Sequence, residues 1–287
     1  MVLRKIDNKK KIQIIKKQIK TLTGNNFHEE YIKEFYIPIL EKIKNKKKIM
    51  ITGPQGSGKS TLSELIRLSL LSIYEKKVVI ISLDDFYLKK SERLQLAKNN
   101  HSLLKVRGVP GTHDIQLLTK IINNLELKKF PVFLPRFNKF KDDREHKFKE
   151  INEVDLIIFE GWCVGADPIN KYYLEKNINF LESEQDSKRI WRNYYNNSLK
   201  ENYQKIFLRF KYKIFFQIPS FEYVYNWRLK QEVKLFKDKP KPSKLKIRKF
   251  IQYFEKLTMW MIKEMPRKSN ILIILDNNQI IQKVVYK

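Results

Sequence analysis

The stretch GPQGSGKST, from Gly53 to Thr61, fits the pattern G-x-x-x-x-G-K-[ST] in full. The apolar residues 48–52 (KIMIT) precede it with the composition of a buried strand, and a helical pattern follows over 60–74. At such a junction the backbone N–H groups of the loop and the dipole of the helix both favour bound phosphate. The stretch therefore predicts a strand, a phosphate-binding loop and a helix, which together begin a P-loop nucleotide-binding fold.

Each residue of this loop is expected to contact ATP. Backbone N–H groups would point at the β-phosphate, while Lys59 would bridge the β- and γ-phosphates. The hydroxyl of Ser60 would ligate a Mg²⁺ ion. The predicted ATP-binding residues are Gly53, Pro54, Gln55, Gly56, Ser57, Gly58, Lys59, Ser60 and Thr61.

Apolar segments and helical patterns alternate along the rest of the chain. Segments typical of buried strands lie at 48–52, 77–83, 154–159, 212–218 and 271–275, with a shorter one at 132–137. Helical patterns lie at 60–74, 115–125 and 184–207, and begin again at about 220 and 244. This alternation predicts an α/β fold of the P-loop NTPase type, a doubly wound, mainly parallel sheet flanked by helices.

The first 46 residues show a different pattern. Two amphipathic helices are indicated, over 8–22 and 28–44, and no strand lies between them. We therefore expect an N-terminal helical extension over 1–46, followed by one P-loop domain over 47–287.

Glycine is scarce, and its positions are informative. Of eight glycines, seven fall in three clusters: the phosphate loop, RGVPGTHD at 107–114 and EGWCVG at 160–165. Glycine is needed where the backbone takes a positive φ or comes very close to another group. The distribution therefore predicts that two further turns belong to the same functional site as the phosphate loop.

Carboxylates follow two of the predicted strands. Asp84 and Asp85 close the segment at 77–83, and Glu160 closes the segment at 154–159. Ligands of parallel sheets bind at the carboxyl ends of the strands, so these acids are expected near the phosphates. Asp84 and Glu160 are candidate Mg²⁺ ligands together with Ser60. Two adjacent aspartates on an extended backbone point in opposite directions, so Asp85 either faces a substrate or caps the following turn.

Composition limits the partners of the chain. The formal net charge is +28, and lysine outnumbers arginine 47 to 12. This charge either marks a surface for nucleic acid or reflects a general lysine bias; the even spread of the lysines favours the second, so a nucleic-acid partner is not expected. No apolar run reaches the roughly 18 residues of a membrane helix. A single cysteine, Cys163, excludes an internal disulfide and indicates a cytoplasmic compartment.

Several motifs together resemble the D-glycerate 3-kinase family, a branch of the group that includes uridine kinase, phosphoribulokinase and bacterial pantothenate kinase. The shared segments are ISLDDFYL, RGVPGTHD, LPRF and IIFEGWCVG, in this order after the phosphate loop. The resemblance is clear from about 48 to 167 and continues weakly to YNWRLKQE at 225–232. The resemblance implies that residues 47–287 form a P-loop kinase domain.

The resemblance also implies roles for single residues. Asp84 matches the catalytic base of the family's D-x-F-[YH] motif, and Arg228 matches a lid arginine that closes over the phosphates. Catalysis is thus expected from Lys59, Asp84 and Arg228. The segments that line the acceptor site contribute Asp85, Tyr87, Arg107, His113, Asp114 and Arg144.

The same segments differ from the family pattern where the acceptor would bind. Phe137 and Asn138 stand in place of a Tyr-Asp pair, and Ala166 follows Gly165 where the family has phenylalanine. The main hypothesis is an ATP- and Mg²⁺-dependent kinase for a small anionic alcohol, with D-glycerate favoured. The alternatives are another acceptor (a nucleoside, pantothenate or a sugar phosphate), a nucleic-acid-associated NTPase, and an ATP-binding module without catalysis. The oligomeric state stays open.

Overall fold

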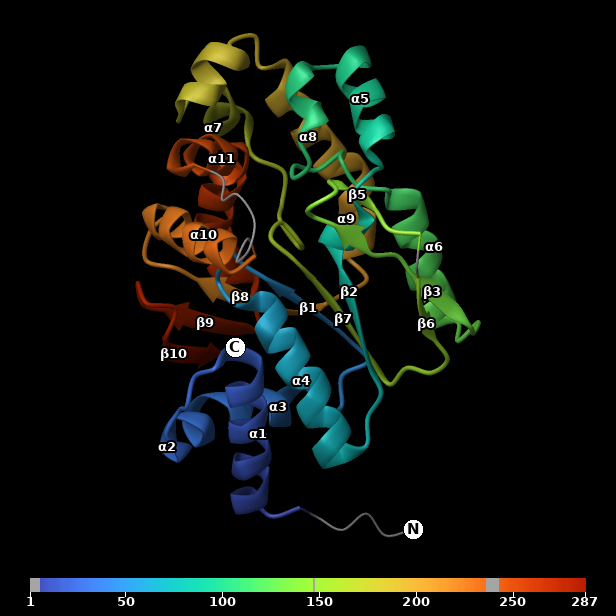
Figure 1. Cartoon of the computed structure of the whole chain (residues 1–287), viewed down its shortest axis with the longest axis vertical. Coiled ribbons are helices and arrows are strands. Elements are labelled where there is room, and N and C mark those ends of the chain that lie inside the picture. Colours follow the sequence, from blue (N-terminus) through green and yellow to red (C-terminus); the bar gives the residue numbers. More distant parts are fainter. Residues whose placement is uncertain (1–5, 147, 236–242) are drawn as a thin grey trace.

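The computed structural model describes residues 6–146, 148–235 and 243–287. Its centre is a six-stranded sheet in the order β10-β9-β8-β1-β7-β2 (Figure 1). Neighbouring strands run parallel except for β10, which pairs antiparallel with β9. The strands are β1 (Lys48–Thr52), β2 (Val78–Ser82), β7 (Leu156–Gly161), β8 (Tyr212–Gln217), β9 (Ile271–Leu275) and β10 (Ile281–Tyr286). The predicted mainly parallel sheet is confirmed.

Helices cover both faces of this sheet (Figure 1). The α-helices are α1 (Asn8–Thr23), α2 (Glu29–Tyr31), α3 (Ile37–Ile43), α4 (Lys59–Tyr74), α5 (Lys90–Asn99), α6 (Ile115–Glu126), α7 (Lys171–Glu175), α8 (Ile190–Ser198), α9 (Gln204–Phe207), α10 (Glu222–Leu235) and α11 (Lys244–Lys268). The π-helical turns η1 (Ile32–Tyr36) and η5 (Leu199–Tyr203) join α2 to α3 and α8 to α9, and η2 (Leu83–Phe86) is a short 3-10 helix after β2. Within the described ranges, none of the helices is both long and apolar enough to cross a membrane.

The strands bury residues on both faces, as the continuous apolar segments of the sequence predict. In β1, Ile49 and Ile51 pack with α1, α3, α4 and α10, whereas Met50 packs with α6, α8, α9 and α11 on the opposite face. The sheet therefore separates two hydrophobic cores and is held rigid between them. Its carboxyl edge, from which the phosphate loop and the acidic residues follow, is the part left for ligands.

The N-terminal helices pack against the domain. Ile12, Ile15 and Ile19 are buried in the same hydrophobic cluster as Leu62 and Leu65 of α4. α1 is delimited by its ends: the Asp7 carboxylate accepts the Lys10 N–H, and Gly24 takes a left-handed conformation. The division into an extension over 1–46 and a domain over 47–287 stays a prediction, of which residues 1–5, 147 and 236–242 lie outside the described residues.

The helix predicted over 184–207 begins later than expected, so this boundary was wrong. The helical conformation is interrupted at Asp186. The buried carboxylate of Asp186 accepts hydrogen bonds from the N–H groups of Trp191 at 2.8 Å and Arg192 at 3.2 Å. Arg189 lies just before α8 with a φ of 61°. A side-chain oxygen that accepts from the first free N–H groups stabilises the start of a helix. Here α8 therefore begins after Asp186, although the helical pattern of the sequence begins at residue 184.

Three small strand pairings were not predicted. The segment expected as one strand at 132–137 divides into β3 (Val132–Leu134) and β4 (Phe137–Asn138). β3 pairs with β6 (Lys149–Ile151), and β4 pairs with β5 (Asp143–Arg144). The third is β10 at the end of the chain. β3, β4, β5 and β6 have only two or three residues each, which is too little periodicity to be read from sequence; this reason does not apply to β10, which has six.

Candidate active site

The register of the sheet brings the phosphate loop and the acids together. Ile51 of β1 lies beside Glu160 of β7, and Ser82, the last residue of β2, lies beside Glu160 on its other side. The loop 53–58 leaves β1 at this edge, and Asp84 lies two residues after β2. The topology thus assembles, from three separate segments, the group of residues that the sequence predicted.

Lys59 is the first residue of α4 and is buried inside the loop. Its Nζ donates to the Pro54 carbonyl at 2.7 Å, which folds the side chain back over the loop. Burial lowers the pKa of Lys59, and the nearby carboxylates of Glu160 and Asp84 partly oppose that effect. An ammonium group in this position can meet phosphate oxygens as they enter the loop.

Two other polar side chains of the loop hold buried oxygen atoms without a hydrogen bond to the described residues. The Ser57 hydroxyl and the Gln55 side-chain oxygen are buried, and within the described residues neither has a hydrogen bond. Such atoms are destabilising unless they are satisfied, so they fit a loop whose partners arrive with a ligand. From outside, the Gln279 amide donates to the Gly56 carbonyl, which ties the β9–β10 turn to the phosphate loop.

Gly56 offers a direct test of this packing. Its φ is 81°, and an added Cβ would lie 2.6 Å from the Cβ of Trp227 in α10. We expect Gly56→Ala to lower the free energy of unfolding by about 2–4 kcal/mol and to weaken ATP binding. Gly24→Ala is the matched control, because Gly24 has a φ of 79° with nothing within 4 Å of an added Cβ. Chemical denaturation and ATP titration measure both; equal losses in the two variants would contradict the packing argument.

Asp84 lies at the centre of the site. Its Oδ2 accepts from Lys139 Nζ at 2.9 Å and its Oδ1 accepts from the Tyr87 hydroxyl at 3.1 Å. Burial alone would raise the pKa of Asp84, but the Lys139 ammonium, its hydrogen bond and the charge of Lys59 together lower the pKa below its ordinary value. The carboxylate is therefore charged at neutral pH and held in one orientation, as a proton acceptor requires.

Glu160 and Ser60 form the candidate metal site. The Ser60 hydroxyl donates to Glu160 Oε2 at 3.3 Å, and burial raises the pKa of Glu160 against the opposing charge of Lys59. A hydroxyl and carboxylates are the hard oxygen ligands that Mg²⁺ takes. Within the described part of the chain, no three His, Cys, Asp or Glu side chains gather as a protein metal cage. Mg²⁺ in general keeps water and phosphate oxygens among its ligands, so it does not require such a cage.

Asp85 points to a different partner from Asp84. Its Oδ1 accepts the Phe137 N–H at 3.1 Å, so it fastens the start of β4 to the end of β2. Burial raises the pKa of Asp85. The two aspartates do have different partners, but the extended backbone assumed for them was wrong, because both lie in the 3-10 helix η2. The structure gives Asp85 a backbone partner, and its predicted contact with a substrate stays a prediction.

The side chains of Tyr87 and His113 pack against each other beside Asp84. Their rings stack with centroids 4.4 Å apart, and the two residues form an isolated antiparallel bridge. His113 Nδ1 lies 2.8 Å from the Tyr203 hydroxyl, which accepts the Gly111 N–H at 2.8 Å. Burial lowers the pKa of His113 to about 3, so the imidazole is neutral. Its buried Nε2 has no hydrogen bond within the described residues.

The predicted acceptor arginines already have counterions. Arg107 Nη1 pairs with Asp142 Oδ1, and the fully buried Arg93 donates to Asp142 Oδ2 at 2.8 Å. Arg144 donates from both Nη atoms to Asp114 Oδ2, each at 3.2 Å. Asp114 also caps α6 by accepting the Leu117 N–H. These pairs fasten the β4–β5 hairpin over the site; a direct role of either arginine in binding an acceptor stays a prediction.

Arg228 projects from α10 and lies over the Phe250 ring, 5.2 Å from its centroid. The Asp84 carboxylate raises the pKa of Lys139, and the positive charge of Arg228 partly opposes this shift. Arg228 thus lies in the neighbourhood of Lys139, and its predicted catalytic role is untested.

Two site residues were missed from the sequence. Lys139 lies in the segment after LPRF, where it was noted only as part of a departure from the family pattern. Tyr203 is 90 residues from His113 along the chain and belongs to no recognised motif. For Lys139 the available signal was its place in an acceptor segment; for Tyr203 there was none.

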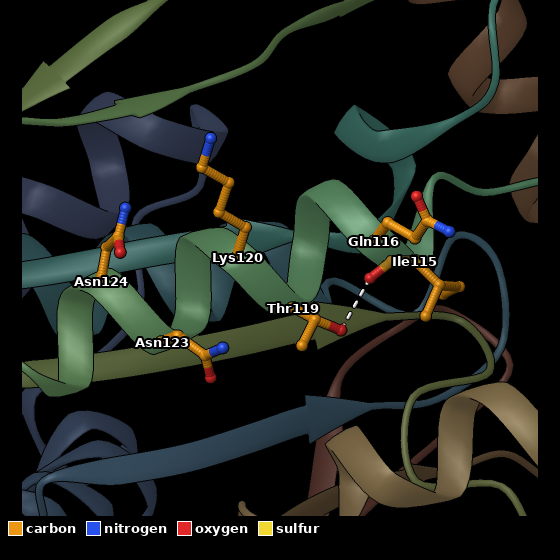
Figure 2. Close-up of a pocket in the computed structure, with 6 residues that line it drawn as sticks. All are labelled: Ile115, Gln116, Thr119, Lys120, Asn123 and Asn124. Atoms are coloured by element: carbon orange, nitrogen blue, oxygen red, sulfur yellow. Dashed lines mark hydrogen bonds between the residues drawn. The ribbon is translucent and has the colours of Figure 1, made fainter.

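A separate open hollow lies away from these residues, on α6 (Figure 2). Its volume is about 430 Å³, and the Thr119 hydroxyl in it donates to the Ile115 carbonyl of the same helix. It is lined by Ile115, Gln116, Thr119, Lys120, Asn123 and Asn124, none of which is a predicted site residue. The hollow is therefore not the candidate active site.

Comparison with known proteins places the chain among kinases. It is 36% identical over 198 residues to the uncharacterized kinase mug58 of Schizosaccharomyces pombe, covering 63% of this chain and 68% of that one. It is 35% identical over 225 residues to the probable ATP-dependent kinase TDA10 of Saccharomyces cerevisiae, covering 72% and 76%. The chloroplastic D-glycerate 3-kinase of Arabidopsis thaliana is 29% identical over 202 residues, covering 66% and 42%. No protein-family model matches the chain.

Solved structures agree on the fold. The YGR205w protein superposes with a TM-score of 0.67 at 29% identity, covering 90% of this chain and 96% of that one. A D-glycerate 3-kinase from Cryptococcus neoformans superposes with a TM-score of 0.71 at 23% identity, covering 97% and 98%.

Fold, loop and acids together define an ATP-dependent P-loop kinase, a phosphotransferase that uses an alcohol group as acceptor. The predicted P-loop fold and use of ATP are confirmed. Within this class, the chain belongs to the D-glycerate 3-kinase family, as the resemblance of its motifs predicted.

Proposed function

We propose that this kinase transfers the γ-phosphoryl group of ATP to D-glycerate, giving 3-phosphoglycerate and ADP. The observation that carries the proposal is Asp84, a charged carboxylate held by Lys139 and Tyr87 at the mouth of the phosphate loop. The Arabidopsis relative, which acts on D-glycerate by its name, supports this acceptor. An anionic acceptor also suits a chain of net charge +28, and the single buried thiol of Cys163 suits a cytoplasmic location.

In the proposed reaction, Asp84 accepts the proton of the acceptor hydroxyl while that oxygen bonds to the γ-phosphorus. The bond from that phosphorus to the bridging oxygen of ADP breaks, and the ammonium of Lys59 stabilises the charge that develops on the phosphoryl oxygens. Arg228 of α10 would contribute in the same way.

Mg²⁺ is the metal we propose for this reaction. Ser60 and Glu160 would hold it, with Asp84 beside them. When bound, it neutralises charge on the phosphate oxygens. We expect chelation with excess EDTA to abolish turnover and added Mg²⁺ to restore it, because the charge on the phosphate oxygens is then no longer neutralised by the metal. Full activity in EDTA would contradict the assignment; the loss and recovery of ADP formation measure it.

The acceptor is tested by a panel in an ADP-formation assay: D-glycerate, a nucleoside, pantothenate and a sugar phosphate. D-Glycerate is expected to give the highest kcat/KM. Turnover with another member and none with D-glycerate would refute the proposed acceptor. ADP formation stimulated by DNA or RNA instead of a small alcohol would favour a nucleic-acid-associated NTPase.

A further inference from the structure

An anionic acceptor whose hydroxyl lies on Asp84 needs a cation that contacts Asp84 and is open to solvent. Arg107 is paired with Asp142, and Arg144 is paired with Asp114. Both arginines donate to these partners through charge-assisted bonds, which a ligand would have to break or share. The cations predicted to bind the acceptor therefore carry their own counterions.

His113 does not supply the missing charge. The Tyr203 hydroxyl accepts the Gly111 N–H, so its own proton is free for His113 Nδ1. The neutral imidazole then carries its proton on Nε2 and can offer a hydrogen bond, but no charge.

Lys139 differs from these three groups. Its Nζ contacts Asp84 Oδ2, and this is its one hydrogen bond and ion pair among the described residues. An ammonium group has three N–H donors, so two stay available. The side chain is 43% exposed, whereas that of Arg107 is 17% and that of Arg144 is 10% exposed. Lys139 therefore combines contact with the proposed base and access from solvent.

The backbone holds Lys139 in this place. The Asn138 side-chain oxygen accepts the N–H of Phe140 at 3.0 Å and of Lys141 at 3.1 Å, which closes a turn around Lys139. The start of the same hairpin is fastened by Asp85 through the Phe137 N–H. A lysine held at the backbone and bonded at its tip is preorganised for one ligand position.

We propose that Lys139 is the specificity-determining residue that binds the carboxylate of the acceptor, with the acceptor hydroxyl on Asp84. The inference rests on the proposed function, because it requires an acidic acceptor. A hydroxyl that donates to Asp84 brings the rest of a three-carbon acid next to the ammonium that Asp84 holds. The same pair then selects both ends of the substrate: the carboxylate of Asp84 takes the hydroxyl and the ammonium of Lys139 takes the acid.

The test compares D-glycerate with its amide, which keeps the shape and removes the charge. Lys139→Met frees Asp84 Oδ2, so kcat should fall to a similar extent for D-glycerate and for the amide. We expect kcat/KM for D-glycerate to fall by about a further 10²-fold relative to the amide, mainly through KM. Lys139→Arg should recover part of the loss. Lys141→Met is the matched control: this lysine is exposed on the same hairpin, and no ion pair involves it within the described residues. It should leave both substrates unchanged.

Equal losses for acid and amide in Lys139→Met would overturn the inference and assign Lys139 to the phosphates instead. A loss specific to D-glycerate in Arg107→Met, with none in Lys139→Met, would overturn it in favour of Arg107. If the wild type uses a different hydroxy acid, the proposed acceptor is wrong, and the comparison of that acid with its amide decides the role of Lys139. If the wild type uses neutral acceptors alone, both proposals fail.

Discussion

Asp84→Asn is expected to lower kcat by about 10³-fold while ATP binding stays nearly unchanged. The asparagine keeps a side-chain oxygen that can accept from Tyr87, so the local packing is preserved. It cannot accept the proton of the acceptor hydroxyl at neutral pH, so the transferring step loses its base. Steady-state kinetics at saturating acceptor, with ATP affinity measured by titration, separate the two effects.

The neighbouring aspartate supplies the control. In Asp85→Asn the side-chain oxygen can still accept the Phe137 N–H, so β4 stays fastened and kcat should remain near the wild-type value. Turnover that survives in Asp84→Asn, or that disappears equally in Asp85→Asn, would show that Asp84 is not the base.

Lys59→Met should lower kcat/KM by about 10²–10³-fold, because the ammonium stabilises charge that develops on the phosphoryl group. Folding should suffer little. The Nζ of Lys59 donates to a neutral group, the Pro54 carbonyl, so its removal breaks no close ion pair with an acid, and methionine has a similar length. Kinetic constants and denaturant unfolding of the same preparation measure the two effects.

Lys256→Met is a contrasting variant at a second buried lysine. Lys256 Nζ lies 3.2 Å from Glu182 Oε2 and donates to the Tyr173 carbonyl at 3.0 Å, in the core on the other face of the sheet. Removing this cation takes a positive charge away from the buried Glu182. We therefore expect the free energy of unfolding to fall by about 3 kcal/mol, with kcat unchanged. If Lys59→Met instead lost stability and kept its turnover, the role of Lys59 would be structural.

The phosphate loop and the sheet were predictable because their signals are local. GPQGSGKST states the loop in consecutive residues, and each buried strand is a short apolar run. Asp84 and Glu160 could be placed as well, since parallel strands end at a common edge. Six of the seven clustered glycines have a positive φ, all but Gly161, which agrees with the turns inferred from their clustering.

The acceptor side was harder, because its pairings join distant residues. Asp142 approaches Arg93 and Arg107 only after the β4–β5 hairpin folds over the site, 49 and 35 residues away along the chain. The same folding brings Lys139 to Asp84 across 55 residues. A sequence shows the charges of such groups but not which of them neutralise one another, so neither the pairing of Arg107 with Asp142 nor that of Lys139 with Asp84 could be predicted.

The central claim is that the γ-phosphoryl group of ATP passes to a small alcohol and not to water. The direct measurement follows ATP labelled at the γ-phosphate during turnover with D-glycerate and Mg²⁺. The label is expected in 3-phosphoglycerate, formed in equal amount with ADP. Label that appears only as inorganic phosphate, with no phosphorylated acceptor, would contradict the account.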